Sequence, residues 1–204
     1  MNNTYYSQAA QDVWVAKKFE YKKNGYFLDV GAYDGIQISN TYFLEKELGW
    51  SGICIEANPS VFNSLALNRK SLNLNVAVSN YQGVGMFLDD SISTDGRGVN
   101  VDFDTLNNIL EKSEAPEIID YLSIDIEGHE FTVLEDFDFS KWHINCMTVE
   151  HNLYVDGPTE KEKIFQLLSN KGFIREVEDA PCLDYNPLYY MKPFEDWYVN
   201  KNLI

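Results

Sequence analysis

Hydrophobic and polar positions alternate along the chain between short apolar runs and segments in which apolar residues recur every three or four positions. The apolar runs predict buried strands, and the spaced pattern predicts helices. Strands that are apolar throughout are typical of a parallel sheet covered on both faces, so we expect an α/β fold whose last two strands form an antiparallel edge. The expected strands are 26–30, 52–56, 73–78, 119–126, 144–150, 173–177 and 188–191, and the expected helices are 7–19, 39–47, 58–67, 105–111, 130–135 and 158–170.

The segment from Asn80 to Asn100 lacks this periodicity and holds four glycines among small polar residues. Such a composition is typical of a hairpin that carries a loop or a lid. Because no repeat, linker or low-complexity stretch divides the chain, we expect a single domain over residues 1–204 with this segment as an insertion.

Composition narrows the class of protein. The 204 residues carry 16 basic and 32 acidic side chains and a net charge of −16, which argues against nucleic acid as a partner because phosphates require a positive surface. The N-terminus has no basic and apolar leader, and no apolar run reaches the roughly 18 residues of a membrane span. Cys54 and Cys146 lie in expected strands, as buried reduced thiols do. We therefore expect a cytoplasmic protein.

Acidic residues stand where four of the expected strands end, which is the edge at which parallel sheets bind ligands. The first strand leads into FLDVGAYDG, in which Gly31 permits a sharp turn and the close approach of a ligand. The motif lacks the later glycines of a dinucleotide-binding loop, and its acids Asp29 and Asp34 favour an ammonium or sulfonium over a pyrophosphate. The alternative is an ordinary turn formed by Asp34 and Gly35.

The second strand ends in Glu56, where a carboxylate can accept hydrogen bonds from both hydroxyls of a ribose. The alternative is an exposed acid that precedes the next helix. Since one ligand could span both strand ends, the two motifs together favour a nucleoside that carries a positive charge, such as S-adenosylmethionine.

Two further strand ends, YLSIDIEGHE and MTVEHN, supply candidate metal ligands and bases. Asp125 and Glu127 share one face of an extended stretch, and Asp125 interrupts an apolar strand, so it needs a ligand, a metal or hydrogen-bond donors. Glu150 could face Asp125 across adjacent strand ends, and with His151 they would form a site for a hard or borderline metal. The alternatives are Glu130 as a helix-terminal charge and His151 as a structural histidine.

In this order and spacing, FLDVGAYDG, ICIEANP, YLSIDIEGHE and VEHN resemble the FkbM-type family of S-adenosylmethionine-dependent methyltransferases, and SQAAQD resembles the SQ-x-x-QD opening of that family. The resemblance runs from about Ser7 to Asn152. It implies a Rossmann-like, seven-stranded, mostly parallel sheet with helices on both faces, which is the class I methyltransferase fold. The tail beyond Pro158 carries no motif of the family.

The resemblance also implies roles for individual residues. It places IDIEGHE, with Asp125, beside the transferring methyl group and makes Glu127 and His151 competing candidates for the general base. It makes Asp125 and Glu150 candidate ligands of Mg²⁺. The implied cofactor site, with Glu56 on the ribose and Ala77 beside the adenine, comprises Gln8, Gln11, Asp29, Gly31, Ala32, Asp34, Gly35, Glu56, Ala77 and Asp125.

We therefore expect methylation of a hydroxyl on a sugar, a glycoconjugate or another small molecule. A hydroxyl is a poor nucleophile at neutral pH, so a strand-end base contributes roughly 10²–10⁴-fold, and a bound Mg²⁺ lowers the pKa of the acceptor. The first competing hypothesis is a nicotinamide-dependent oxidoreductase, which predicts a glycine-rich loop in place of Ala32-Tyr33-Asp34. The second is a methyltransferase-like binding subunit without activity, which predicts the loss of the strand-end acids.

Overall fold

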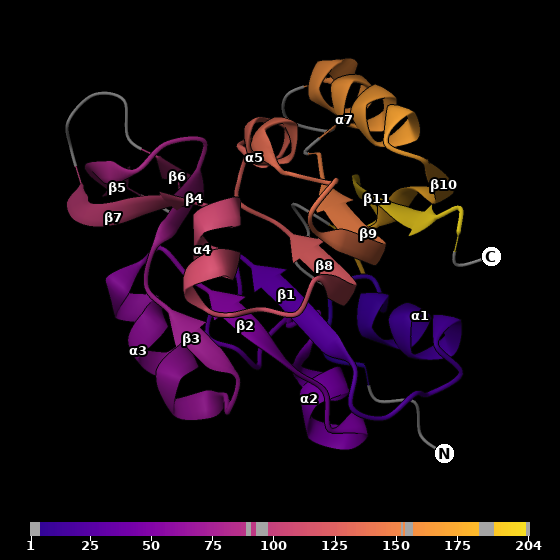
Figure 1. Ribbon diagram of the computed structural model, residues 1–204, viewed down its shortest axis with the longest axis horizontal. Helices are drawn as coiled ribbons and strands as arrows, with labels where there is room; N and C mark the ends of the chain where they lie inside the picture. Colours follow the sequence, from indigo (N-terminus) through magenta and orange to yellow (C-terminus); the bar gives the residue numbers. More distant parts are fainter. Residues whose placement is uncertain are drawn as a thin grey trace.

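The computed structural model describes residues 5–88, 91–92, 98–151, 153, 157–183 and 190–202. Its centre is a seven-stranded sheet with the order β10-β11-β9-β8-β1-β2-β3 (Figure 1). Neighbouring strands run parallel from β9 to β3, whereas β11, second from the edge, is antiparallel to both β9 and β10. The predicted fold class, with an antiparallel pair at one edge, is confirmed. The strands are β1 (Tyr26–Val30), β2 (Ser51–Ile55), β3 (Leu72–Leu74), β8 (Ile118–Ile124), β9 (His143–Glu150), β10 (Phe173–Pro181) and β11 (Pro193–Asn200).

Helices cover both faces of this sheet (Figure 1). Successive residues of a strand point to opposite faces, so Leu28 packs in one cluster and its neighbour Phe27 in the other. The Phe27 cluster faces α1, α2 and α3, and the Leu28 cluster faces α4, α5 and α7. The helices are α1 (Gln11–Lys18), α2 (Tyr42–Leu48), α3 (Pro59–Asn68), α4 (Leu106–Lys112), α5 (Glu130–Asp136) and α7 (Pro158–Asn170).

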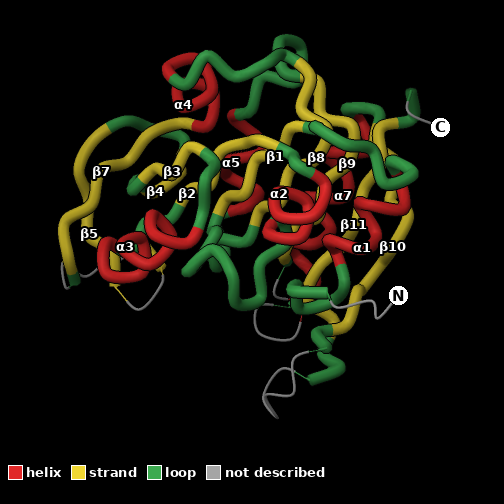
Figure 2. Tube along the Cα trace, turned by 90° about the horizontal axis from the view of Figure 1, so that it is seen from below, coloured by secondary structure: helices red, strands yellow, loops and turns green. Residues whose placement is uncertain are grey.

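A second, four-stranded sheet with the order β4-β7-β5-β6 lies at the β3 end of the molecule, away from β10 (Figure 2). The single strand expected at 73–78 is therefore wrong, because its residues divide between β3 and β4. Asn75 stands at the break, where its side-chain amide donates to the carbonyls of Glu56 and Ala57 at 2.8 and 3.0 Å. Such side-chain bonds compete with a strand ladder. The strands are β4 (Ala77–Ser79), β5 (Gly83–Leu88), β6 (Ser91–Ile92) and β7 (Val99–Thr105).

The segment from Asn80 to Asn100 contains β5, which pairs antiparallel with β7. Residues 89–90 and 93–97 lie outside the described part of the chain. The function of this segment as a lid stays a prediction, as does the organisation of residues 1–204 as a single domain.

The first helix begins later than residue 7, where it was expected. It starts at Gln11 because Ser7 lies in an extended segment that bridges to Ile38, and because Ala10 has a left-handed φ of 65°. The hydroxyl of Ser7 donates to Oδ1 of Asp12 at 2.7 Å. This hydrogen bond ties the segment that precedes α1 to the first turn of α1. The bridge to Ile38 places the same segment beside the loop that follows β1.

The last strand also lies elsewhere than expected. It is β11 instead of 188–191, of which residues 188–189 are outside the described ranges. Its sequence contains two adjacent acids, Glu195 and Asp196, which interrupt the apolar pattern although they are only 2% and 1% exposed. Burial of these acids explains why hydrophobicity did not reveal the strand.

Two features bear on the class of protein. Cys54 and Cys146 are buried free thiols, Cys182 is also buried, and burial raises the pKa of Cys54 to about 12. A thiol with so high a pKa is inert at neutral pH. Among the described residues, no helix has the length and apolar character needed to cross a membrane.

Candidate active site

A small cleft with an empty volume of about 270 Å³ lies where β1 and β8 end side by side in the sheet. The amide of Asp125 donates to the carbonyl of Val30 at 3.0 Å, and the amide of Gly31 donates to the carbonyl of Ile55 at the same distance. Gly31 has a left-handed φ of +88°, which turns the chain sharply away from the sheet. The cleft is lined by Gln8, Asp29, Gly31, Ala32, Tyr33, Gln37, Ile38, Ser39, Asn40 and Asp125.

Asp29 is the buried carboxyl group of this cleft. The hydroxyl of Thr41 donates to its Oδ2 at 2.5 Å, and a guanidinium nitrogen of Arg69 lies 3.9 Å from the same oxygen. Burial raises the pKa of Asp29, while the charge of Arg69 opposes the rise. The ionised form of Asp29 therefore depends on Arg69.

Arg69 organises the loop after β1, and no sequence motif pointed to it. Its fully buried side chain donates to the carbonyl of Gly35 and the hydroxyl of Ser39, both at 3.3 Å, and to the hydroxyl of Thr41 at 2.9 Å. Its Nε donates to Glu45 at 3.1 Å. In sequence, a single arginine after an amphipathic helix is indistinguishable from a solvated one, so the pattern offered no signal.

Glu56 holds the loop after β1 against the end of β2. Its Oε2 accepts a hydrogen bond from the amide of Tyr33 at 3.0 Å, and its Oε1 accepts one from the amide of Asn58 at 2.7 Å. Glu56 therefore contacts the loop that lines the cleft through Tyr33, although it is not itself among the lining residues. Its role on a ribose stays a prediction.

Asp34 acts as a turn residue. Its Oδ1 accepts hydrogen bonds from the amides of Ile36 and Gln37 at 2.9 and 2.8 Å, and Gly35 beside it has a left-handed φ of +82°. This geometry is the one that the turn alternative predicts. The cofactor roles of Asp34 and Gly35 stay predictions.

Gln11 and Ala77, the other predicted cofactor residues, are both buried. Gln11 begins α1, and its Oε1 accepts a hydrogen bond from the amide of Ala9 at 2.7 Å. Ala77 begins β4 in the second sheet and packs in a small apolar cluster beside Ala57, which follows Glu56. Neither is among the residues that line the cleft.

Three carboxyl groups meet at the ends of β8 and β9. An oxygen of each of Asp125, Glu127 and Glu150 lies within 4.8 Å of the others. Burial raises the pKa of Glu150 well above its ordinary value, and the charges of Asp125 and Glu127 raise it further. Burial also raises the pKa of Asp125, whose side chain shares a hydrogen bond with Glu150. A proton or a cation is needed to stabilise this group.

The loop between β8 and α5 is held by Glu130. Its carboxylate accepts hydrogen bonds from the amides of Ile126 at 2.8 Å and Gly128 at 3.1 and 3.2 Å, and burial raises its pKa to about 7. Glu127 and Gly128 have left-handed φ angles of 56° and 98°. For Glu127 this conformation is strained, and such strain persists where the surroundings fix it, often at functional sites.

Glu195 is a further buried acid beside Glu150, and apolar periodicity does not reveal it because the pattern does not predict its strand. It pairs in register with Glu150 across β11 and β9, and its Oε1 accepts a hydrogen bond from the indole of Trp197 at 2.6 Å. Burial raises its pKa well above the ordinary value, and the charge of Asp125 adds to the rise.

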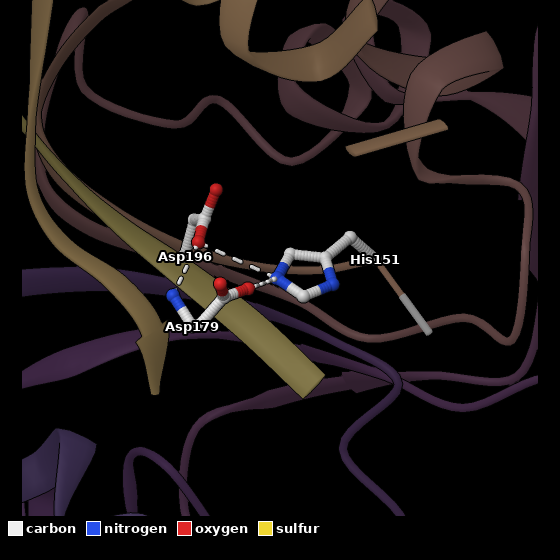
Figure 3. Close-up of side chains that lie close together, drawn as sticks. All are labelled: His151, Asp179 and Asp196. Carbon is white, nitrogen blue, oxygen red and sulfur yellow. Dashed lines mark hydrogen bonds and ion pairs between the residues drawn. The ribbon is translucent and has the colours of Figure 1, made fainter. Parts of the chain in front are cut away.

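His151 lies apart from the three carboxyl groups. Its Nε2 is 3.4 Å from Oδ1 of Asp196 and 3.7 Å from Oδ1 of Asp179 (Figure 3). Glu150 and His151 are consecutive at the end of β9, so their side chains leave on opposite faces of the sheet. The structure thus brings Asp125, Glu127 and Glu150 together and places His151 in a second cluster, while the competing roles as general base stay predictions.

The chain matches the family model described as "Methyltransferase FkbM domain" over residues 29–175, which is more than half of its length. The match contains Glu56 and the IDIEGHE and VEHN motifs, and it extends past the expected end at Asn152 through α7. No curated protein sequence matches the chain.

Solved methyltransferase structures share the fold. A methyltransferase FkbM from Methylobacillus flagellatus KT superposes with a TM-score of 0.55 at 12% identity over 87% of this chain, which spans only 43% of that protein. The N-terminal domain of human METTL16 in complex with SAH gives 0.52 at 14% identity, covering 97% of this chain and 71% of that one. A precorrin-6y C5,15-methyltransferase from Geobacter metallireducens GS-15 gives 0.52 at 10% identity, covering 98% and 92%. At such identities the likeness is one of fold.

Proposed function

Because the chain belongs to the FkbM family of methyltransferase domains, we propose that it transfers a methyl group from S-adenosylmethionine to a hydroxyl of a small acceptor such as a sugar or a glycoconjugate. The observation that carries this proposal is the double position of Asp125. This residue lines the cleft and also belongs to the carboxyl group cluster with Glu127 and Glu150. One residue therefore joins the place for a cofactor to the place for acid–base chemistry.

The residues around the cleft fit a cationic nucleoside. Gly31 leaves the backbone accessible, and Asp29 and Asp125 supply negative charge for an ammonium and a sulfonium. A carboxylate offers about four acceptor positions, so Glu56 can hold backbone amides and ribose hydroxyls together. When bound, S-adenosylmethionine supplies a methyl group on a sulfonium, whose thioether leaves without an acid.

We assign the general base to Glu127. Its side chain is exposed, whereas Glu150 is buried and shares a hydrogen bond with Asp125. Glu127 lies within reach of Asp125 and Glu150 at the edge of the cleft, where an acceptor hydroxyl can approach from solvent. Glu127 would accept the proton of the acceptor hydroxyl, a contribution of roughly 10²–10⁴-fold.

Asp125 and Glu150 are the proposed ligands of Mg²⁺. Their oxygen donors are of the kind that this ion prefers, and a divalent cation would replace the proton that they share. Bound there, Mg²⁺ would lower the pKa of the acceptor hydroxyl. Calorimetry with Mn²⁺ in two buffers of different ionisation enthalpy should show binding with proton release. Activity that is indifferent to EDTA, together with no Mn²⁺ binding, would remove the metal and leave the methyl transfer.

Calorimetry with S-adenosylhomocysteine tests the cofactor. The wild type should bind, Glu56→Ala should bind at least 10-fold more weakly because a strand-end hydrogen bond to the ribose is lost, and Glu162→Ala, at an exposed position of α7, should match the wild type. A wild type that binds neither S-adenosylhomocysteine nor S-adenosylmethionine would overturn the proposal. Binding of NAD instead would favour the oxidoreductase.

The class of acceptor requires its own assay. Transfer of a radiolabelled methyl group to hydroxylated sugars, to glycoconjugates and to RNA should favour the first two, because a net charge of −16 repels a phosphate backbone. Labelling of RNA alone would refute the small-molecule acceptor while leaving the transferase activity intact.

A further inference from the structure

We propose that His151 is a positioning residue, which acts together with Asp196 and Asp179 to hold the end of β9 and thereby the carboxyl group of Glu150. This inference rests on the proposed function, because Glu150 matters only if its site is the reacting one. It assigns Asp196 and Asp179 a positioning role together with His151, and it excludes His151 as the general base.

The register of the sheet separates His151 from the reacting groups. Glu195 pairs with Glu150, so these two side chains share one face of the sheet. That face carries α1, where Trp197 contacts Trp14 with ring centroids 5.0 Å apart. His151 and Asp196, each one residue further along, therefore lie on the face of α7.

Both ring nitrogens of His151 face protein groups. The amide of Leu153 donates to Nδ1 at 3.3 Å, so the ring proton is on Nε2, which points at the two aspartates (Figure 3). At 3.4 and 3.7 Å, Nε2 attracts the carboxylates but makes no hydrogen bond within the described part of the chain. The nitrogen that could accept a proton is thus occupied by the backbone and lies away from the cleft.

The two aspartates join His151 to neighbouring elements. Oδ1 of Asp196 accepts the amide of Asp179 at 2.8 Å, and its Oδ2 accepts from Arg175 at 3.0 Å. Asp179 has a left-handed φ of 56° at an irregularity in the pairing of β10, and its carboxylate holds Lys161 of α7 at 2.6 Å. This cluster fixes β9, β10, β11 and α7 to one another.

The cluster needs no metal ion, although its donor atoms lie within 4.8 Å of one another. Lys161 already neutralises Asp179, and Arg175 already neutralises Asp196. A divalent cation placed between the two aspartates would be repelled by Lys161 and Arg175, which contact the same carboxylates at 2.6 and 3.0 Å.

The consequence for Glu150 follows from the backbone. The amide of His151 donates to the carbonyl of Phe194 at 2.8 Å, which continues the ladder one step beyond Glu150. If the contact between the ring of His151 and Asp196 is lost, the backbone at His151 and the neighbouring Glu150 can shift. A displacement of about 1 Å at a reacting group can cost about 10²-fold in rate.

The test compares His151→Gln, Asp196→Asn and the double variant, with His143→Gln, an exposed histidine at the first residue of β9, as the control. We expect both single variants to lower kcat by about 10²-fold, with affinity for S-adenosylhomocysteine within two-fold of the wild type. The double variant should be no slower than the slower single variant, because His151 and Asp196 act as one unit. The dependence of kcat on pH should keep the same shape as in the wild type. Loss of the low-pH limb, on which kcat rises as a general base loses its proton, only in His151→Gln and not in Asp196→Asn would identify His151 as the base and overturn the inference.

Amide hydrogen exchange tests, without an activity assay, whether His151 and Asp196 hold the end of β9. Exchange at His151, whose amide bonds to Phe194, should be faster in both variants and unchanged in His143→Gln. If the wild type shows no methyl transfer, the proposed function fails, and faster exchange at this amide still supports the hold on the end of β9. Unchanged exchange would refute that hold whatever the activity.

Discussion

A side chain at Gly31 would lie 1.7 Å from the backbone oxygen of Asp125, because the ends of β1 and β8 pass each other at that point. The approach of the two strand ends leaves no room for a Cβ at Gly31, and Gly31 needs a left-handed φ of +88° in addition. The glycine therefore sets the distance between the loop that follows β1 and the first of the three carboxyl groups.

Gly31→Ala should push the ends of β1 and β8 apart and distort the cleft that Gly31 and Asp125 line. We expect a loss of roughly 3–5 kcal/mol in the free energy of unfolding, because backbone atoms must move, and the loss of S-adenosylhomocysteine binding. The control is Gly49→Ala, between the end of α2 and the start of β2. Its φ is +68°, and among the described residues an added Cβ would meet only the side chain of Asn24, at 3.3 Å. It should cost about 1–2 kcal/mol through backbone strain alone. Equal losses of stability in urea unfolding would contradict this account.

Arg69→Met should leave Asp29 buried without its cation. Removing one partner of a buried ion pair costs about 3–5 kcal/mol, because the remaining charge stays uncompensated. Asp29→Asn in the same chain should recover part of this loss, since it removes that charge. Lys70→Met, at the exposed neighbouring position, should stay within about 0.5 kcal/mol of the wild type. Urea unfolding of the wild type, of the single variants Arg69→Met and Asp29→Asn and of their double variant measures the coupling, and additive losses would show that Arg69 and Asp29 act independently.

The fold could be read from apolar periodicity wherever a strand is apolar throughout. The expected strand 26–30 and helix 158–170 coincide with β1 and α7. Periodicity failed at Asn75, where side-chain hydrogen bonds interrupt a strand, and at β11, where Glu195 and Asp196 are buried against expectation. In both places contacts distant in sequence outweigh local pattern.

In the candidate site, too, some residues can be found from local sequence pattern and others depend on tertiary contacts. Asp125, Glu127 and Glu150 could be found because each follows a recognisable strand, and the end of a parallel strand has a known place in the fold. Arg69 could not be found, because its partners come from loops whose course depends on tertiary contacts. The expected joint site of His151 with Asp125 and Glu150 is not formed, because residues adjacent in a strand face opposite ways and His151 groups with Asp179 and Asp196.

The stability of the protein should fall as the pH rises from about 5 to 8. Burial raises the pKa of Glu130 to about 7 in the folded state, above the roughly 4.3 of an unfolded chain. Between these values the folded protein holds a proton that the unfolded one lacks, so stability is full below the unfolded pKa and is lost through the folded pKa. A single such group accounts for up to roughly 3 kcal/mol.

Glu130→Gln should reduce the fall in stability, because glutamine does not titrate, while the raised pKa values of Glu150 and Glu195 maintain the remainder. Urea unfolding at pH 5.5 and pH 8 measures the difference in free energy for the wild type and the variant. Glu135→Gln, at an exposed position of the same helix, should keep the wild-type dependence. A wild type that gains stability with rising pH would refute the assignment.

Asp125→Asn should stabilise the protein and abolish methyl transfer. Asparagine keeps the shape of Asp125 and can donate to Glu150, while it removes a buried negative charge beside two others. We expect a gain of about 1 kcal/mol without metal and a loss of roughly 10²–10⁴-fold in rate, the exchange of stability for activity that acidic sites display.

The control for the sign of this stability change is Asp120→Asn, in β8, the strand that Asp125 follows. Oδ1 of Asp120 is 2.9 Å from Nζ of Lys22, and its Oδ2 accepts the amide of Tyr26 at 2.9 Å. Its charge is compensated, so removing it should destabilise the protein by about 1–3 kcal/mol and leave activity intact. Opposite signs in thermal unfolding would show that the charge of Asp125 is kept for function. If both variants lose stability alike, the three carboxyl groups are already neutralised, and the cleft has no excess charge with which to hold a cationic cofactor.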